Sequence, residues 1–207
     1  CIATTEFKMD EPDPLELTVE ETKVISCNAL NEYGNPYSDG ALTAHAKGGV
    51  WLQTNENNGL PYYYTWKKKT ANGTWQVLIN QVDSIATNLD AGEYAVNVKD
   101  ANGVILGTYG ADNELEKAID TLYTLQEPPL LEISTTQQNV YCYAGSDAWA
   151  EVSITGGIAP YTIAWSNNDT TMRATELSAG TYEVHVTDAR GCEAIMQVVI
   201  TEPEAPV

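Results

Sequence analysis

Basic residues are scarce in this sequence, which argues against nucleic acid as a partner. The 207 residues include 10 Lys and Arg against 29 Asp and Glu, a formal net charge of −19. Nucleic-acid binding needs clustered positive charge, so we expect no nucleic acid partner. Acidic side chains could instead hold Ca²⁺. No compact acidic loop motif occurs, however, and a solvated acidic surface is the simpler interpretation.

Long apolar runs and the usual signatures of chemistry are missing as well. No stretch approaches the 18 consecutive apolar residues of a membrane-spanning helix, and no phosphate-binding loop occurs. The four cysteines form no Cys-x-x-Cys pair, which argues against zinc. His45 and His185 have no nucleophile or carboxylate matched to them in the sequence. We therefore expect no catalytic residue, no metal and no cofactor, and a protein that is not an enzyme.

The sequence does contain an internal repeat. Residues 177–191 align without a gap with residues 89–103, and both segments begin Leu-x-Ala-Gly-x-Tyr. Trp165 aligns with Trp66, and in both cases a Pro-Tyr pair precedes the tryptophan. These matches indicate two copies of one structural unit, the first of which contains insertions.

Glu-Pro pairs mark the ends of the copies and divide the chain into four parts. These pairs occur at residues 11–12, 127–128 and 202–203, and each is followed by another proline within three residues. Such prolines stiffen short linkers and end strand pairing. We predict that residues 1–12 are the last strand of a preceding repeat, 13–128 an enlarged repeat, 129–203 a minimal repeat and 204–207 the start of the next.

The pattern within each copy predicts an all-β fold of tandem immunoglobulin-like β-sandwich domains, of the fibronectin type III or PKD kind. Ala148, Ala150 and Val152 alternate with polar residues, as in a half-buried strand. Trp66 and Trp165 fit the tryptophan of the third strand, and Tyr94 and Tyr182 fit a tyrosine corner before the sixth. One helix is predicted, over residues 112–118, with Asp112 as its cap.

The second copy resembles a known repeat family. The run from Gly156 to Trp165, followed by residues 177–192, closely resembles the SprB repeat of the large mobile adhesins of gliding flavobacteria. The resemblance covers most of residues 130–203 and is weaker over 13–128, where Lys117 aligns with Cys192. It implies export by the type IX system, an extracellular position at the surface of the outer membrane, and a role in adhesion or gliding motility. Its expected partners are neighbouring repeats of the same chain and, through other parts of the protein, the outer-membrane motility and secretion machinery.

Three aromatic residues are candidates for contact with a glycan. Trp149 falls out of phase with its inward-facing neighbours, and Trp51 and Tyr63 flank an insertion of the first copy. Exposed rings of this kind could stack on sugars, which makes surface polysaccharide a second candidate partner. The alternative is that these rings cover an inserted hairpin or a domain junction.

The cysteines allow two pairings. The simpler one joins Cys142 to Cys192 within the second copy. However, segments 131–142 and 192–203 are equally long and run parallel in this kind of sandwich. At about 3.3 Å per residue, these two cysteines then lie tens of ångströms apart, too far for a disulfide. We therefore predict a bond between the copies, from Cys27 to Cys192, which an oxidising exterior permits.

The main functional hypothesis is a structural segment of a long cell-surface adhesin that holds an adhesive tip away from the cell. A glycan-binding module is the second hypothesis. The third is a spacer within a secreted polysaccharide-degrading enzyme, which the sequence beyond both ends would decide.

Overall fold

The structure is a computed structural model that describes residues 12–28, 36–50, 62–109 and 115–205. Its chain contacts divide it into two compact units. The first comprises residues 1–24 and 38–126, and the second comprises residues 25–37 and 127–207. The division by contacts falls between residues 126 and 127, and the predicted bounds 13–128 and 129–203 stay predictions. Segment 25–37, which the sequence pattern assigned to the first repeat, belongs by its contacts to the second unit.

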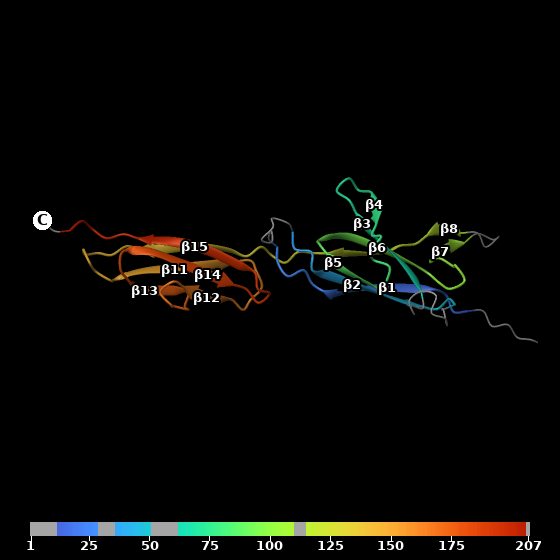
Figure 1. Cartoon of the computed structure of the whole chain (residues 1–207), viewed down its shortest axis with the longest axis horizontal. Coiled ribbons are helices and arrows are strands. Elements are labelled where there is room, and N and C mark those ends of the chain that lie inside the picture. The colour runs from blue at the N-terminus through green and yellow to red at the C-terminus, as the bar shows by residue number, and fades with distance from the viewer. Residues whose placement is uncertain (1–11, 29–35, 51–61, 110–114, 206–207) are drawn as a thin grey trace, which may run out of the picture. The chain divides into compact units, whose positions relative to one another are not determined.

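The second unit is a sandwich of two three-stranded sheets, ordered β10-β11-β13 and β12-β14-β15 (Figure 1). Its strands are β10 (Glu132–Gln138), β11 (Ala148–Thr155), β12 (Thr162–Trp165), β13 (Arg173–Leu177), β14 (Gly180–Thr187) and β15 (Glu193–Ile200). The first, second and fourth strands form one sheet, and the third, fifth and sixth form the other. This strand distribution is that of an immunoglobulin-like domain and confirms the predicted fold class.

Side chains from both sheets meet in one core. Val152 comes from the first sheet and Trp165 and Val184 from the second, and all are at most 3% exposed. The alternation in β11 holds, because Ala148, Ala150 and Val152 are buried.

The first unit repeats this arrangement with additions. Its sheets are ordered β1-β2-β5 and β4-β3-β6-β9, and a separate hairpin pairs β7 with β8. The strands are β1 (Glu16–Lys23), β2 (Gly40–Lys47), β3 (Tyr63–Lys69), β4 (Trp75–Val77), β5 (Ile85–Leu89), β6 (Gly92–Lys99), β7 (Gly107–Tyr109), β8 (Leu115–Ala118) and β9 (Thr121–Leu125). The edge strand β4 and the β7–β8 hairpin account for part of the extra length, and both lie outside the shared six-strand framework.

The two units match residue by residue at the centre of the fold. Trp66 pairs with Val96 across β3 and β6, as Trp165 pairs with Val184 across β12 and β14. The indole N–H of Trp66 donates to the carbonyl of Asp83 at 2.9 Å, and that of Trp165 to Thr171 at the same distance. The sequence alignment of the two tryptophans is therefore correct.

Both predicted tyrosine corners are present. The hydroxyl of Tyr94 donates to the carbonyl of Asp90 at 2.8 Å, and that of Tyr182 donates to Ser178 at 3.1 Å. Each bond reaches back four residues and closes the turn before the fifth framework strand. Burial and the nearby Asp90 carboxylate raise the pKa of Tyr94, so its hydroxyl stays a hydrogen-bond donor.

The predicted helix over residues 112–118 is wrong in its described part. Residues 115–118 form strand β8, which pairs with β7 from Gly107↔Ala118 onward. The charged pattern of this segment suits an exposed edge strand equally well, and pairing with β7 decides the outcome. No helix among the described residues is long and apolar enough to cross a membrane.

Two other predictions fall largely outside the described residues. The last strand predicted over 1–12 is described only at Pro12, and the start of a further repeat at 204–207 only at Glu204 and Ala205. Both stay predictions.

Candidate functional site

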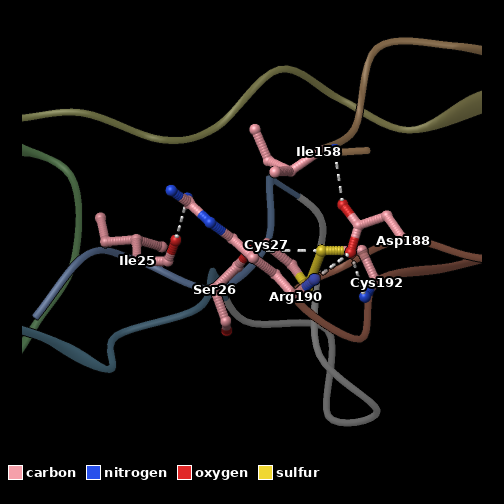
Figure 2. The surroundings of a disulfide bond; sticks show 7 residues. All are labelled: Ile25, Ser26, Cys27, Ile158, Asp188, Arg190 and Cys192. Atoms are coloured by element: carbon pink, nitrogen blue, oxygen red, sulfur yellow. Dashed lines mark hydrogen bonds between the residues drawn. A yellow bond between two sulfur atoms is a disulfide. The ribbon is translucent and has the colours of Figure 1, made fainter. Parts of the chain in front are cut away.

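A buried aspartate organises one end of the second unit. Asp188 follows β14 and is 6% exposed. Its Oδ1 accepts the backbone N–H groups of Arg190 at 2.8 Å and Cys192 at 3.0 Å, and its Oδ2 accepts that of Ile158 at 2.9 Å. One carboxylate thus fixes the β14–β15 turn and ties it to the loop after β11 (Figure 2).

The hydrogen bonds set the charge state of Asp188. Burial by itself disfavours the carboxylate, but the N–H groups of Cys192, Ile158 and Arg190, together with the Arg190 charge, outweigh it. The pKa of Asp188 therefore lies below its ordinary value. Its oxygens therefore serve as ionised acceptors of the turn.

The turn presents Cys192, which forms a disulfide with Cys27. The two Cα atoms are 5.6 Å apart, and the residues are separated by 165 positions in sequence. Cys27 is 4% exposed and Cys192 is 8% exposed, so the bond is buried. The predicted pair is confirmed, and the alternative pair of Cys142 with Cys192 does not occur.

Two further contacts hold the segment before Cys27. The Arg190 guanidinium donates from Nη1 to the Ile25 carbonyl at 2.9 Å, and the Sγ of Cys192 lies 3.2 Å from the Ser26 carbonyl oxygen. Figure 2 shows Arg190 reaching past the disulfide toward Ile25. The backbone carbonyls of the two residues before Cys27 are thus both contacted by the turn. Arg190 was not singled out in the sequence, because its role depends on a residue far away in the chain.

The first unit has the same turn without the cysteine. Asp100 accepts N–H groups from Val50, Asn102 and Val104 at 2.8–3.0 Å, and the residue in the Cys192 position of the turn is Val104. The sequence alignment placed Lys117 there. Counting back from β9 along its register with β6 does lead to Lys117. However, Lys117 lies in β8 and pairs with Thr108 of β7, so it is not part of the turn.

Cys142 is the counterpart of Cys27 in the β10–β11 loop of the second unit. It is exposed and free. The loop is held by bonds from the Tyr141 N–H to Asp147 at 3.1 Å and from the Ala144 N–H to Glu202 at 2.6 Å. Its neighbours Tyr141 and Tyr143 are 69% and 51% exposed. An ordered loop therefore presents a thiol between two exposed rings.

Two of the three aromatic glycan candidates lie among the described residues, and each has a cation over its ring. The guanidinium of Arg173 lies 3.7 Å from the ring centre of Trp149, and the Lys99 ammonium lies 4.8 Å from that of Tyr63. Trp149 and Tyr63 belong to different units, and Trp51 lies outside the described residues. One face of each described ring is therefore occupied by a cation of its own unit.

Both histidines are exposed and paired with a carboxylate. His45 Nε2 is 3.0 Å from Glu20, and His185 Nε2 is 2.7 Å from Glu183. The described residues contain no group of three His, Cys, Asp or Glu side chains that could hold a metal ion. These contacts are those of surface side chains.

Several solved structures are similar to this chain. The three N-terminal domains of the outer capsid protein Hoc of bacteriophage RB49 align over 89% of this chain and 59% of theirs, with 17% identity and a TM-score of 0.44. A C-terminal fragment of intimin, solved with the intimin-binding domain of its receptor Tir, aligns over 89% and 63%, with 11% identity and a TM-score of 0.36. Domains 4–9 of the surface layer protein SbsC align over 94% and 31%, with 17% identity and a TM-score of 0.30.

Sequence comparison is informative for the second unit. No curated protein is significantly similar to the chain. Residues 134–170 match the SprB repeat family. This range runs from within β10, through β11 and β12, to the loop before β13. The resemblance noted in the sequence is therefore confirmed over residues 134–170 of the second unit, which match the SprB repeat.

Proposed function

We propose that this chain is a structural segment of a long cell-surface adhesin that holds an adhesive tip away from the cell and serves surface adhesion or gliding motility. The SprB repeat at 134–170, the tandem immunoglobulin-like units and the disulfide support this proposal. A disulfide of this kind persists in an oxidising, extracellular setting. The net charge of −19 keeps such a segment soluble.

One observation carries the proposal: the disulfide closes the chain around most of its folded structure. Cys27 precedes β2, and Cys192 follows β14, so all strands from β2 to β14 lie between the bonded residues. Tension between the two ends of the chain passes from residue 27 to residue 192 through the sulfur atoms. The enclosed residues then carry none of it, which suits a segment that must transmit force without lengthening.

The length protected in this way is large. The chain from Cys27 to Cys192, a sequence separation of 165, would reach roughly 540–590 Å if fully extended, at about 3.3–3.6 Å per residue. While the bond is intact, only residues 1–26 and 193–207 can be drawn out. Among the described strands, these stretches contain β1 and β15.

Single-molecule stretching with handles at both ends tests the proposal. The oxidised chain is expected to lack the extension that the enclosed residues would release, and the Cys27→Ser, Cys192→Ser chain is expected to gain roughly 540–590 Å. A Cys142→Ser chain is the matched control and should behave like the unaltered protein. If the oxidised chain unfolds to the same length as the double variant, the force-transmitting role is excluded.

The other two hypotheses make different predictions. A glycan-binding module would bind sugars on a saccharide array and lose that binding in Trp51→Ala or Trp149→Ala. Arg173 stacks on one face of Trp149, and a sugar would have to displace it or use the other face. A spacer in a secreted polysaccharide-degrading enzyme would have a catalytic domain elsewhere in the same polypeptide.

A further inference from the structure

We propose that the Cys142 loop is a docking site for a further SprB-type repeat, which would bond to Cys142 through a cysteine in the Cys192 position of its own β14–β15 turn. This inference rests on the proposed function, because it needs repeats in tandem. It assigns a partner to Cys142, which has no part in the proposed function.

The first support is the bond made by the matching residue. Cys27 and Cys142 occupy the same place in their repeats, in the loop between the first and second strands. Cys27 is bonded to the turn of the second unit, whereas Cys142 is free and exposed. The chain thus contains one completed junction of this type and one cysteine placed to begin another.

The second support is the state of the backbone before Cys142. At the completed junction, Arg190 contacts the carbonyl of Ile25 and Cys192 contacts that of Ser26. The matching carbonyls are those of Val140 and Tyr141. Among the hydrogen bonds of the described residues, neither of these two carbonyls is an acceptor, although both N–H groups donate, to Thr201 and Asp147. The acceptors that an incoming arginine and cysteine would contact are therefore unoccupied.

The loop is also fixed before any partner arrives. The Gly145 N–H donates to the Cys142 carbonyl at 3.0 Å, and Glu202 holds the N–H of Ala144, which adopts a positive φ of 59°. Cys142 therefore has a defined direction of presentation. Tyr141 and Tyr143 on either side offer apolar surface for a partner to cover.

The chemistry of the bond is ordinary thiol–disulfide exchange. With glutathione disulfide as oxidant, the Cys142 thiolate attacks one of its sulfurs and releases one glutathione thiol. The partner cysteine then attacks the mixed disulfide and releases the second. Two protein thiols become one disulfide, and one glutathione disulfide becomes two thiols.

A tandem protein tests this proposal. Residues 1–203 are followed directly by a second copy of residues 129–207, with Cys1→Ser and with Cys142→Ser in the added copy only. After equilibration in glutathione buffer, non-reducing peptide mapping should find Cys142 joined to the Cys192 of the added copy. The control carries Cys142→Ser and Ser178→Cys in the first copy, which moves the thiol to another exposed loop. The yield of the predicted bond should exceed that of the control bond at least tenfold.

Two outcomes overturn the proposal: Cys142 that stays free or capped by glutathione, and Cys142 that pairs with the Cys142 of a second molecule. The Cys27–Cys192 bond in the same digest reports that the tandem protein has folded. If that bond is missing, the test is repeated with two separate chains. One is the unaltered chain, and the other carries Cys27→Ser and Cys142→Ser, so that its Cys192 is free. Preferred pairing of Cys142 with that Cys192 supports the proposal, and Cys142–Cys142 dimers overturn it. Neither negative result bears on the stretching test, which depends only on Cys27 and Cys192.

Discussion

The two repeats share a centre and differ at their ends. Trp66 and Trp165, Tyr94 and Tyr182, and Asp100 and Asp188 make the same bonds in both units. By contrast, the turn after the fifth framework strand presents Val104 in one unit and Cys192 in the other. The core residues therefore specify the sandwich, and the residues at the turns specify what each repeat can be joined to.

Removal of the disulfide should produce the largest difference in stability between the two units. The Cys27→Ser, Cys192→Ser chain is expected to lose about 2–5 kcal/mol of stability in the second unit, the usual effect of removing a native disulfide. The first unit has no bond at this turn and should keep its own transition. Chemical denaturation monitored for each unit checks this, and equal losses in both units would contradict the comparison.

The aspartate turn should matter equally in both repeats. Asp188→Ala and Asp100→Ala each remove the acceptor of three backbone N–H groups and should cost about 3 kcal/mol. The contribution of Asp188 depends on pH, because its pKa is lowered in the folded state. Its contribution is therefore present above the ordinary aspartate pKa of about 3.9 and is lost as the pH falls through the lower folded value.

Acid unfolding of an Asp188→Asn chain measures this effect, since the amide does not titrate. This variant should show a weaker loss of stability of the second unit below about pH 4 than the unaltered chain does. If both chains lose the same stability below about pH 4, other carboxylates dominate the acid sensitivity of this unit.

Glycines before the third framework strand should show a smaller but position-specific effect. A Cβ on Gly156 would lie 1.8 Å from the Leu130 carbonyl oxygen, and one on Gly48 would lie 1.9 Å from that of Pro14. Both residues also have positive φ, so either change to Ala should cost about 2–3 kcal/mol. Gly191→Ala is the control: its φ is +85° but nothing lies within 4 Å, so only about 1 kcal/mol is expected. Thermal unfolding that ranks Gly191→Ala as costly as Gly156→Ala would show that the close approach is unimportant.

The surface histidines should have the smallest effect. His45→Ala and His185→Ala remove exposed pairs with Glu20 and Glu183. Such pairs contribute little, and each change should alter stability by less than about 0.5 kcal/mol. A larger loss in thermal unfolding would assign one of these residues a role that its exposed contacts do not explain.

The core and the disulfide were predictable because their signals are local or repeated. Trp165 and Tyr182 recur at matched positions in the first copy, and the parallel course of the first and last strands excluded Cys142 as the partner of Cys192. Other features depend on register or on distant residues. Arg173 reaches Trp149 only because β13 pairs with β11 at Glu151↔Arg173. The alignment began the insertion directly after Gly103, whereas the structure keeps Val104 in the turn, where its N–H donates to Asp100.

Peptide mapping of the unaltered chain under non-reducing conditions tests the central claim most directly. The claim is that the loop of one repeat is covalently joined to the turn of the next. We expect a linked peptide pair that contains Cys27 and Cys192, with Cys142 recovered as a free thiol. A linked pair that contains Cys142 and Cys192 would contradict it and would leave Cys27 without its disulfide to the turn of the second unit.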